Sequence, residues 1–324
     1  MIQTADSADA RDPIRRRIEA LGSRLSLPTV IRALGSLEGE HASSRRGNGY
    51  DFMDIRPYEP SEEARLIDWK ASARAGRPMI VNKEQESNGN IWLLMDIGRE
   101  MCGHCPNGER PIDVAANAMR MFAMLSLRRS DDLSMVLGDN SNITRIPFSG
   151  GFAKFEHVFD ALLERDMNHP RDFGALIDYA RKIRNRHAMV VLATDETAWT
   201  DEHIGALRLL AQTHPLIVIN VAVLNPFAAN QHFSSVVNAA NGLRVPAFLR
   251  TPQTAEGVET HRRYAADALE CQLASTGSTQ IHGGSSEAMF NEFVTLVSGA
   301  LARSGFSQRA DRNLNTPNML GGLS

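Results

Sequence analysis

The sequence predicts an α/β protein built around a doubly wound, mostly parallel sheet. Three short, continuously apolar runs predict strands that are buried on both faces, at 90–96, 187–195 and 215–226. Helical patterns separate these runs, and this alternation is typical of parallel sheets. Two of the runs end on an acidic residue, Asp96 and Asp195. Because ligands bind such sheets at the carboxyl ends of the strands, these aspartates mark the predicted functional edge.

Two segments precede the predicted sheet. Residues 1–40 are expected to form a helical extension, because their apolar side chains fall on one narrow stripe at helical spacing: Ile14, Ile18, Leu21 and Leu25. We expect this helix to lie across the main domain, with a partner-binding arm as the alternative. Residues 41–89 lack a long apolar period and are expected to be irregular. Within them we predict a short helix over about 63–74 and an edge strand near 78–85.

Residues 90–302 are expected to form the main domain. After the strand at 90–96, Pro111 stands where a first helical turn would begin. Two strands joined by a turn are predicted at 132–139 and 143–149. The rest of the pattern is helix 152–166, helix 173–185, strand 187–195, helix 201–214, strand 215–226, helix 259–277, strand 278–284 and helix 286–305. The last residues, 303–324, are polar and predict a tail.

Composition argues against several classes of function. Of the 324 residues, 43% are hydrophobic and 23% charged, as in an ordinary globular protein. The net charge of −3 does not favour nucleic acid or an anionic membrane as the main partner. Three cysteines make no disulfide framework, which suits a reducing compartment. The N-terminus has no apolar leader, and no apolar stretch is long enough to span a bilayer. We therefore expect a cytoplasmic protein without a transmembrane segment.

The segment 47–78 carries a dense motif. Its first half reads Gly47, Gly49, Asp51, Phe52, Asp54, Arg56 and Tyr58, and its second half reads Arg65, Ile67, Asp68, Trp69, Lys70, Ala71, Ala73 and Arg74. This resembles the signature of the bacterial family known as domain of unknown function 58, in which G-x-G-x-[DE]-F-x-D-x-R-x-Y leads into R-x-I-D-W-K-A-[ST]-A-R. One departure is Ser61, which stands where relatives carry the glycine of Pro-Gly-Asp-Asp, and serine lacks the backbone freedom of glycine at such a turn.

The resemblance covers roughly residues 40–300 and implies a von Willebrand factor A-like domain after the signature. It also implies a non-enzymatic adaptor, because family members commonly accompany MoxR-type AAA+ ATPases and are thought to act with them in complex assembly or maturation. We therefore expect a MoxR-type ATPase as the partner. The candidate binding residues in the signature are Arg56, Tyr58, Arg65, Asp68, Trp69 and Arg74. Their mixture of arginine, aromatic and acidic side chains also predicts a structural clasp of buried ion pairs on the main domain.

A-type domains hold Mg²⁺ through the motif D-x-S-x-S, a threonine from a second loop and an aspartate from a third strand end. Hard oxygen ligands of this kind suit Mg²⁺. Here Asp96 matches the first aspartate, but Gly98 and Glu100 replace the two serines. Asp195 matches the third strand end. The candidate metal ligands are therefore Asp96, Glu100 and Asp195.

The threonine position of that site falls on Arg171 or Asp172. Glycine has no side chain with which to ligate, and an arginine would bring positive charge towards the cation. We therefore expect a degenerate metal site without a cofactor, with Asp96 and Asp195 serving as caps or as ion-pair partners of Arg99 or Arg171. The alternative is a Mg²⁺-dependent binding module of the A type.

Cys102-Gly103-His104-Cys105 spells the dithiol motif of disulfide isomerases, so a thiol-disulfide oxidoreductase using Cys102 and Cys105 is a second alternative. That chemistry needs the first cysteine at a helix N-terminus, where its pKa is lowered. Pro106-Asn107-Gly108 follows at once and predicts a turn instead. Two cysteines and one histidine are also too few for a zinc site. We expect an inert surface loop and no enzymatic activity.

Overall fold

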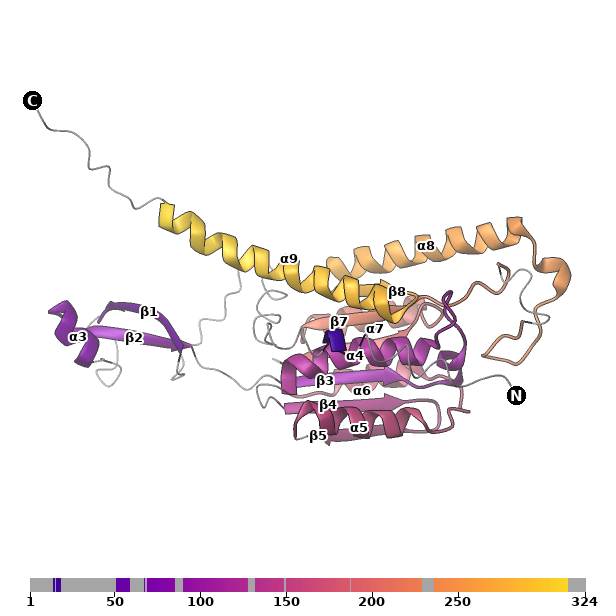
Figure 1. Cartoon of the computed structure of the whole chain (residues 1–324), viewed down its shortest axis with the longest axis horizontal. Helices are drawn as coiled ribbons and strands as arrows, with labels where there is room; N and C mark the ends of the chain where they lie inside the picture. The colour runs from indigo at the N-terminus through magenta and orange to yellow at the C-terminus, as the bar shows by residue number, and fades with distance from the viewer. Residues whose placement is uncertain are drawn as a thin grey trace, which may run out of the picture. The chain divides into compact units, whose positions relative to one another are not determined.

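The computed structural model describes residues 14, 16–18, 51–58, 67, 69–84, 90–127, 132–148, 150–186, 188–228 and 236–313. The chain divides into two compact units (Figure 1). One consists of residues 39–88, and the other of residues 1–38 together with 89–324. In the described residues, no helix combines the length and the apolar character that crossing a bilayer requires.

The larger unit contains a six-stranded sheet in the order β5-β4-β3-β6-β7-β8. Its strands are β3 (Asn90–Asp96), β4 (Asp132–Gly138), β5 (Ile143–Phe148), β6 (Met189–Asp195), β7 (Leu216–Val221) and β8 (Thr279–Gly283). Neighbouring strands run parallel, except that β5 lies antiparallel to β4 at one edge. This is the strand order of a doubly wound sheet, in which the connections reverse direction between β3 and β6. The predicted fold class is confirmed.

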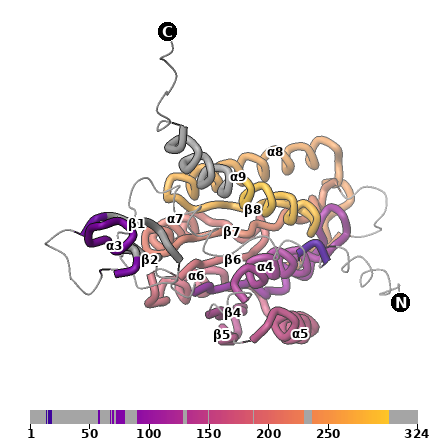
Figure 2. Tube along the Cα trace, turned by 60° about the vertical axis from the view of Figure 1, so that its left-hand side comes forward, coloured from indigo at the N-terminus to yellow at the C-terminus, as the bar shows by residue number. Residues whose placement is uncertain are grey.

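Helices cover both faces of this sheet. One face packs against α4 (Pro111–Leu127), α5 (Phe152–Leu163) and α9 (Ser286–Asn313), and the other against α6 (Phe173–Arg181), α7 (Asp201–Ala211) and α8 (Pro252–Ala274). Alternate residues of β3 point to opposite faces, so Leu93 joins the first core cluster and Leu94 the second. Figure 2 shows α4 and α9 on the same side of the sheet, where they are in contact. Burial on both faces explains why the strands read as continuous apolar runs.

The described residues of the N-terminal extension, 14 and 16–18, are helical and pack on the larger unit. Ile14 and Ile18 are 9% and 2% exposed and belong to the core. The Arg17 guanidinium lies 4.2 Å from the ring centroid of Phe290 in α9. The predicted helix across the main domain is confirmed for these residues, while Leu21 and Leu25 of the same stripe lie outside the described part of the chain.

The smaller unit pairs β1 (Asp51–Pro57) with β2 (Met79–Glu84) in an antiparallel ladder and adds α3 (Trp69–Ala75). The edge strand near 78–85 was expected, and the helix begins at Trp69. The prediction of irregular structure was wrong for β1. A register shift between Phe52 and Asp54 interrupts the ladder, so this strand lacks the period-two alternation that marks strands in a sequence.

The start of α8 and the end of α9 are the helix boundaries that differ most from expectation. Helix α8 starts at Pro252 instead of 259, because the Thr251 side chain accepts a hydrogen bond from the backbone N–H of Thr254 and proline suits a first turn. Helix α9 continues to Asn313, into the segment that the sequence predicted as a polar tail. No proline occurs between residue 286 and Pro317, so no proline breaks the helix at residue 303.

Candidate functional site

The two acidic strand ends lie side by side at the centre of the sheet. Asp96 is the last residue of β3 and Asp195 the last residue of β6, and these strands are parallel neighbours. Both side chains are 1% exposed. They stand at the switch point of the doubly wound sheet, where the crevice of such folds opens. The structure thus brings together the two strand-end aspartates that the sequence singled out.

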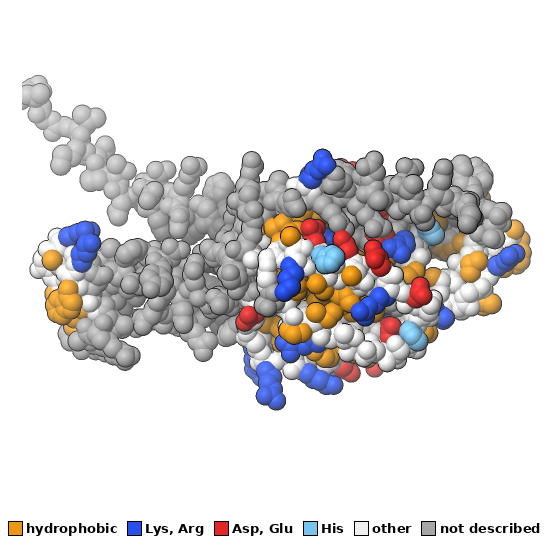
Figure 3. All heavy atoms as spheres, turned by 60° about the horizontal axis from the view of Figure 1, so that its bottom comes forward, with side chains coloured by type: hydrophobic (Ala, Val, Ile, Leu, Met, Phe, Trp, Pro, Cys, Tyr) orange, Lys and Arg blue, Asp and Glu red, His pale blue; other side chains and the backbone are white. Residues whose placement is uncertain are grey.

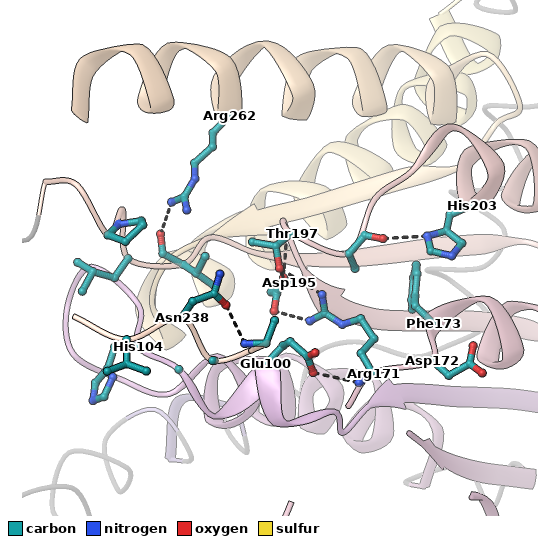
Figure 4. Close-up of a pocket in the computed structure, with 18 of the residues that line it drawn as sticks. Glu100, His104, Arg171, Asp172, Phe173, Asp195, Thr197, His203, Asn238 and Arg262 are labelled. Carbon is teal, nitrogen blue, oxygen red and sulfur yellow. Dashed lines mark hydrogen bonds and ion pairs between the residues drawn. The ribbon is translucent and has the colours of Figure 1, made fainter. Parts of the chain in front are cut away.

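A third charged side chain, Arg171, enters between them from the loop that precedes α6. Its Nε donates to Asp96 Oδ2 at 2.5 Å, and its Nη2 donates to Asp195 Oδ2 at 2.5 Å. Its Nη1 donates to Thr197 Oγ1 at 3.2 Å. Figure 4 shows the guanidinium of Arg171 directed at Asp195 and Thr197. One cation thus bridges the two central strands, and we call Asp96, Asp195 and Arg171 the arginine clamp.

Neutral donors complete the hydrogen bonding of the two carboxylates. Thr194 Oγ1 donates to Asp96 Oδ2 at 2.8 Å, and the Gly98 N–H donates to Asp96 Oδ1 at 2.9 Å. The Thr197 N–H and Oγ1 donate to Asp195 Oδ1 at 2.7 and 2.5 Å. Burial of a carboxylate is costly unless its oxygens are paired. Every oxygen of the clamp carboxylates has such a partner.

The loop that carries Arg171 lies against the end of β3. The Arg99 N–H donates to the His169 carbonyl at 2.8 Å, and the Arg171 N–H donates to Glu100 Oε2 at 3.0 Å. A Cβ atom placed on Gly98 would lie 2.7 Å from the Cα of Arg171. Only glycine at position 98 permits this close approach of the two backbones.

The environment raises the pKa of both Asp96 and Arg171, for different reasons. Burial raises the pKa of the Asp96 carboxyl. The charge of Arg171 and the hydrogen bonds that Asp96 accepts from Gly98 and Thr194 lower this pKa, but burial prevails. Burial alone would lower the pKa of Arg171, but the charges of Asp195 and Asp96 outweigh it and raise that pKa above its ordinary value. The guanidinium therefore remains charged throughout the physiological range.

The residues do not fit a divalent cation. Of the candidate ligands, Asp96 and Asp195 form ion pairs with the Arg171 side chain. Glu100 accepts a hydrogen bond from the backbone N–H of Arg171. Asp172, the other residue considered at the threonine position, accepts a hydrogen bond from the Ala175 N–H and caps α6. Arg99, the other proposed ion-pair partner, donates instead to the Ala240 carbonyl. In the described part of the chain, no three Asp, Glu, His or Cys side chains form a metal-binding group.

The Cys-Gly-His-Cys stretch differs from the expected surface loop. Met101 and Cys105 are buried at 0% and 1% exposure, and Cys102 ends the short 3₁₀ helix η2 (Arg99–Cys102). Burial raises the pKa of Cys105 to about 12, and burial also raises that of Cys102. Neither thiol begins a helix, so the arrangement lacks the features that produce a reactive thiolate.

The signature residues are only partly described. Arg65 and Asp68 lie outside the described residues, as does the side chain of Arg56. The Tyr58 N–H donates to the Pro78 carbonyl at 2.9 Å, and Arg74 is exposed. The side chain of Trp69 is 72% exposed, so the smaller unit leaves it open to solvent. The packing of this segment on the main domain therefore stays a prediction.

A cavity of about 1090 Å³ opens beside the arginine clamp. One wall comes from α6 and α7, including Phe173 and Ala206, and another from Leu224 and Phe227 after β7. The segment from Val236 to Ala240 contributes a further wall. Figure 4 shows Arg171, Asp195 and Phe173 around this space. Sequence reasoning missed the 236–245 wall, because these residues carry no periodic pattern and lie far from the strand ends along the chain.

Two solved structures show partial similarity to this chain. The SpRpn10 VWA domain aligns with 64% of this chain and 95% of that chain, at 12% identity and a TM-score of 0.38. An aerotolerance-related membrane protein from Bacteroides fragilis aligns with 64% of this chain and 98% of that one, at 10% identity and a TM-score of 0.39.

Two curated relatives are uncharacterized proteins of Mycobacterium tuberculosis and Mycobacterium bovis. Each is 26% identical over 225 residues, which is 66% of this chain and 67% of the relative. The sequence model of one family, described as protein of unknown function DUF58, matches residues 54–228, from the middle of β1 to just beyond β7. Since that match spans more than half of the 324 residues, the chain belongs to the DUF58 family.

Proposed function

We propose that this chain is a non-catalytic protein-interaction module that binds its partner at the carboxyl edge of the sheet. The observation that carries this proposal is the cavity beside the arginine clamp, at the switch point where folds of this type bind their ligands. Its walls come from loops and helix starts, which leave the opening accessible to a segment of another protein.

Exposed apolar side chains next to the cavity support a protein as the ligand. Val237, in the cavity wall, is 51% exposed, and Leu243 and Phe248 in the same connection are 66% and 78% exposed. Large apolar groups held in solvent are typical of protein-binding surfaces. Figure 3 shows a face of the larger unit where acidic, basic and hydrophobic side chains are interspersed, whereas a nucleic-acid-binding face gathers Lys and Arg.

The chemistry of the cavity argues against catalysis. None of the described residues that line it is a serine or a cysteine. The Thr197 hydroxyl is bonded to Asp195, and Nδ1 of His203 lies 2.8 Å from the Ala198 carbonyl. Among the described lining residues the only hydroxyl–carboxylate pair is Thr197 and Asp195, and Arg171 donates to both groups, so we propose that this pair serves the clamp and not a reaction.

The partner we propose is a MoxR-type AAA+ ATPase, following the resemblance of the signature segment, with a role in complex assembly or maturation. In this proposal the metal site is degenerate, so binding at the strand-end edge requires no divalent cation. The apolar wall around Val237 provides the contact area, and the clamp holds the loops that shape it.

The test is an affinity measurement with purified full-length chain and the MoxR-type ATPase of the same genome. Val237→Asp places a charge in the cavity wall, and we expect it to weaken binding by roughly tenfold or more, a loss of about 1.4 kcal/mol. Leu209→Asp is the matched control, because Leu209 is an aliphatic side chain of similar exposure, 49%, outside the cavity. We expect it to bind like wild type.

The possible results separate the two parts of the proposal. If wild type does not bind the ATPase, the partner is wrong. If wild type binds and Val237→Asp binds equally well, the surface is wrong. Equal losses in Val237→Asp and Leu209→Asp would also reject this surface.

A further inference from the structure

We infer that the Arg171 guanidinium is a permanent internal cation that replaces a divalent metal at the strand-end site, and that Gly98 is the residue that admits it. A-type domains would place a metal ion at this point, whereas here the chain supplies the positive charge itself. This inference concerns the chain alone and does not depend on the identity of the partner.

The first step is the set of atoms around the guanidinium. Its three nitrogens contact one carboxylate oxygen of Asp96, one of Asp195 and the hydroxyl of Thr197. Carboxylate and hydroxyl oxygens from these loops are the donors that Mg²⁺ takes in proteins. Arg171 therefore occupies the convergence point of the oxygens that a metal would need.

The second step is charge balance. Two carboxylates that are each 1% exposed repel one another and require a nearby positive charge. Arg171, with a side chain 11% exposed, supplies that charge from within the site. A metal ion and the guanidinium cannot share the position, because both need the same oxygens and they repel one another. Occupation by Arg171 therefore excludes the metal.

The third step links position 98 to position 171. A Cβ on Gly98 would come within 2.7–2.8 Å of the Cα, Cβ and N atoms of Arg171. A serine at 98, as in the metal-binding motif, would push this backbone away and withdraw the guanidinium. Both positions therefore depart from the metal-binding pattern together. The missing side chain at Gly98 leaves the room that the backbone of Arg171 occupies.

The experiment measures Mn²⁺ binding from the loss of the electron paramagnetic resonance signal of free Mn²⁺. We expect no binding by wild type. Arg171→Ser removes the cation and adds a hydroxyl, so it should bind Mn²⁺ with a dissociation constant of about 10⁻⁴–10⁻³ M, a range typical of weak oxygen-ligand sites, and Mg²⁺ should compete. Arg171→Lys retains the charge and should not bind.

Two further variants locate the ion. Arg171→Ser with Asp195→Asn should lose the binding, because one carboxylate ligand is gone. Arg181→Ser is the matched control, because Arg181 is an exposed arginine paired with the exposed Asp178 in α6, and it should behave like wild type. Binding by wild type that Asp96→Asn abolishes would overturn the inference, and so would a folded Arg171→Ser that binds no Mn²⁺.

Circular dichroism decides the case in which Arg171→Ser does not fold. If adding Asp195→Asn restores the fold, the defect was repulsion between the two carboxylates, as the inference requires. If Arg171→Ser with both Asp96→Asn and Asp195→Asn also fails to fold, Arg171 is needed for packing and not for charge, and the inference is wrong.

Discussion

Two arginines of this protein, Arg171 and Arg120, have side chains 11% and 4% exposed and form similar ion pairs in very different surroundings. Arg171 bridges Asp96 and Asp195, whose side chains are 1% exposed. Arg120 in α4 donates to Asp160 at 2.5 Å and lies 4.0 Å from Glu156, and these carboxylates are 34% and 17% exposed. It also donates to Asn117 and lies 5.1 Å from the ring centroid of Phe159. The two arginine side chains have similarly low exposure, but only the carboxylate partners of Arg171 are shielded from solvent.

The difference teaches what each arginine does for the fold. If Arg120 is removed, water can still reach its carboxylates. If Arg171 is removed, two negative charges stay buried at close range without compensation, and such loss is far more costly than loss of a solvated pair. Arg171 therefore acts as the counter-ion of a buried site, whereas Arg120 fastens one helix to another.

The largest effect is expected for Arg171→Ala. We expect it to lower the free energy of unfolding by about 3–5 kcal/mol, because it leaves two buried carboxylates unpaired. Urea denaturation at neutral pH without divalent cations measures this loss. Arg171→Ala with Asp96→Asn and Asp195→Asn should recover part of it, since the charges are then removed together. A loss no larger than that of Arg120→Met would contradict the comparison.

A smaller effect is expected for Arg120→Met, which keeps the packing of the aliphatic stem and removes the charge. We expect the free energy of unfolding to fall by about 1.5–3 kcal/mol, the contribution typical of hydrogen bonds to charged groups. The same urea titration measures it. High salt should reduce the difference from wild type, because these carboxylates are partly in water, whereas the effect at Arg171 should be nearly independent of salt.

The smallest effect is expected at Asp139, a carboxylate that neutral donors stabilise without any arginine. Its Oδ1 accepts from the Ser141 N–H at 2.8 Å, the Ser141 hydroxyl at 2.6 Å and the Asn142 N–H at 3.0 Å. Burial alone would raise the pKa of Asp139, but these hydrogen bonds prevail and hold it below its ordinary value. The charged form therefore stabilises the turn between β4 and β5.

Asp139→Asn tests this carboxylate through its pH dependence. A lowered pKa in the folded state means that the stabilisation is complete above the pKa of the unfolded chain and is lost as the pH falls through the folded-state pKa. We expect the variant to unfold at a lower temperature than wild type at pH 7, with the gap closing in acid. A gap that is constant with pH would show that the charge of Asp139 contributes nothing.

The sequence predicted most elements that depend on local patterns. The continuously apolar strands, the helix starting at Pro111 and the hairpin at 132–148 all occur as expected. Asp96 and Asp195 were placed correctly because parallel strands end at the same edge of a sheet. β1 escaped prediction because its bulge removes the alternation that identifies a strand.

The sequence alone determined the order of the elements, the doubly wound sheet and the acidic strand ends, because apolar periodicity and capping act over a few residues. Three features were decided only by the tertiary structure. Arg171, and not Asp172, enters the site, Cys105 is buried, and the segment from Val236 to Ala240 lines the cavity. These features depend on close approach between residues far apart in the chain. Gly98 shows the reason, because its role appears only when the backbone of Arg171 lies against it.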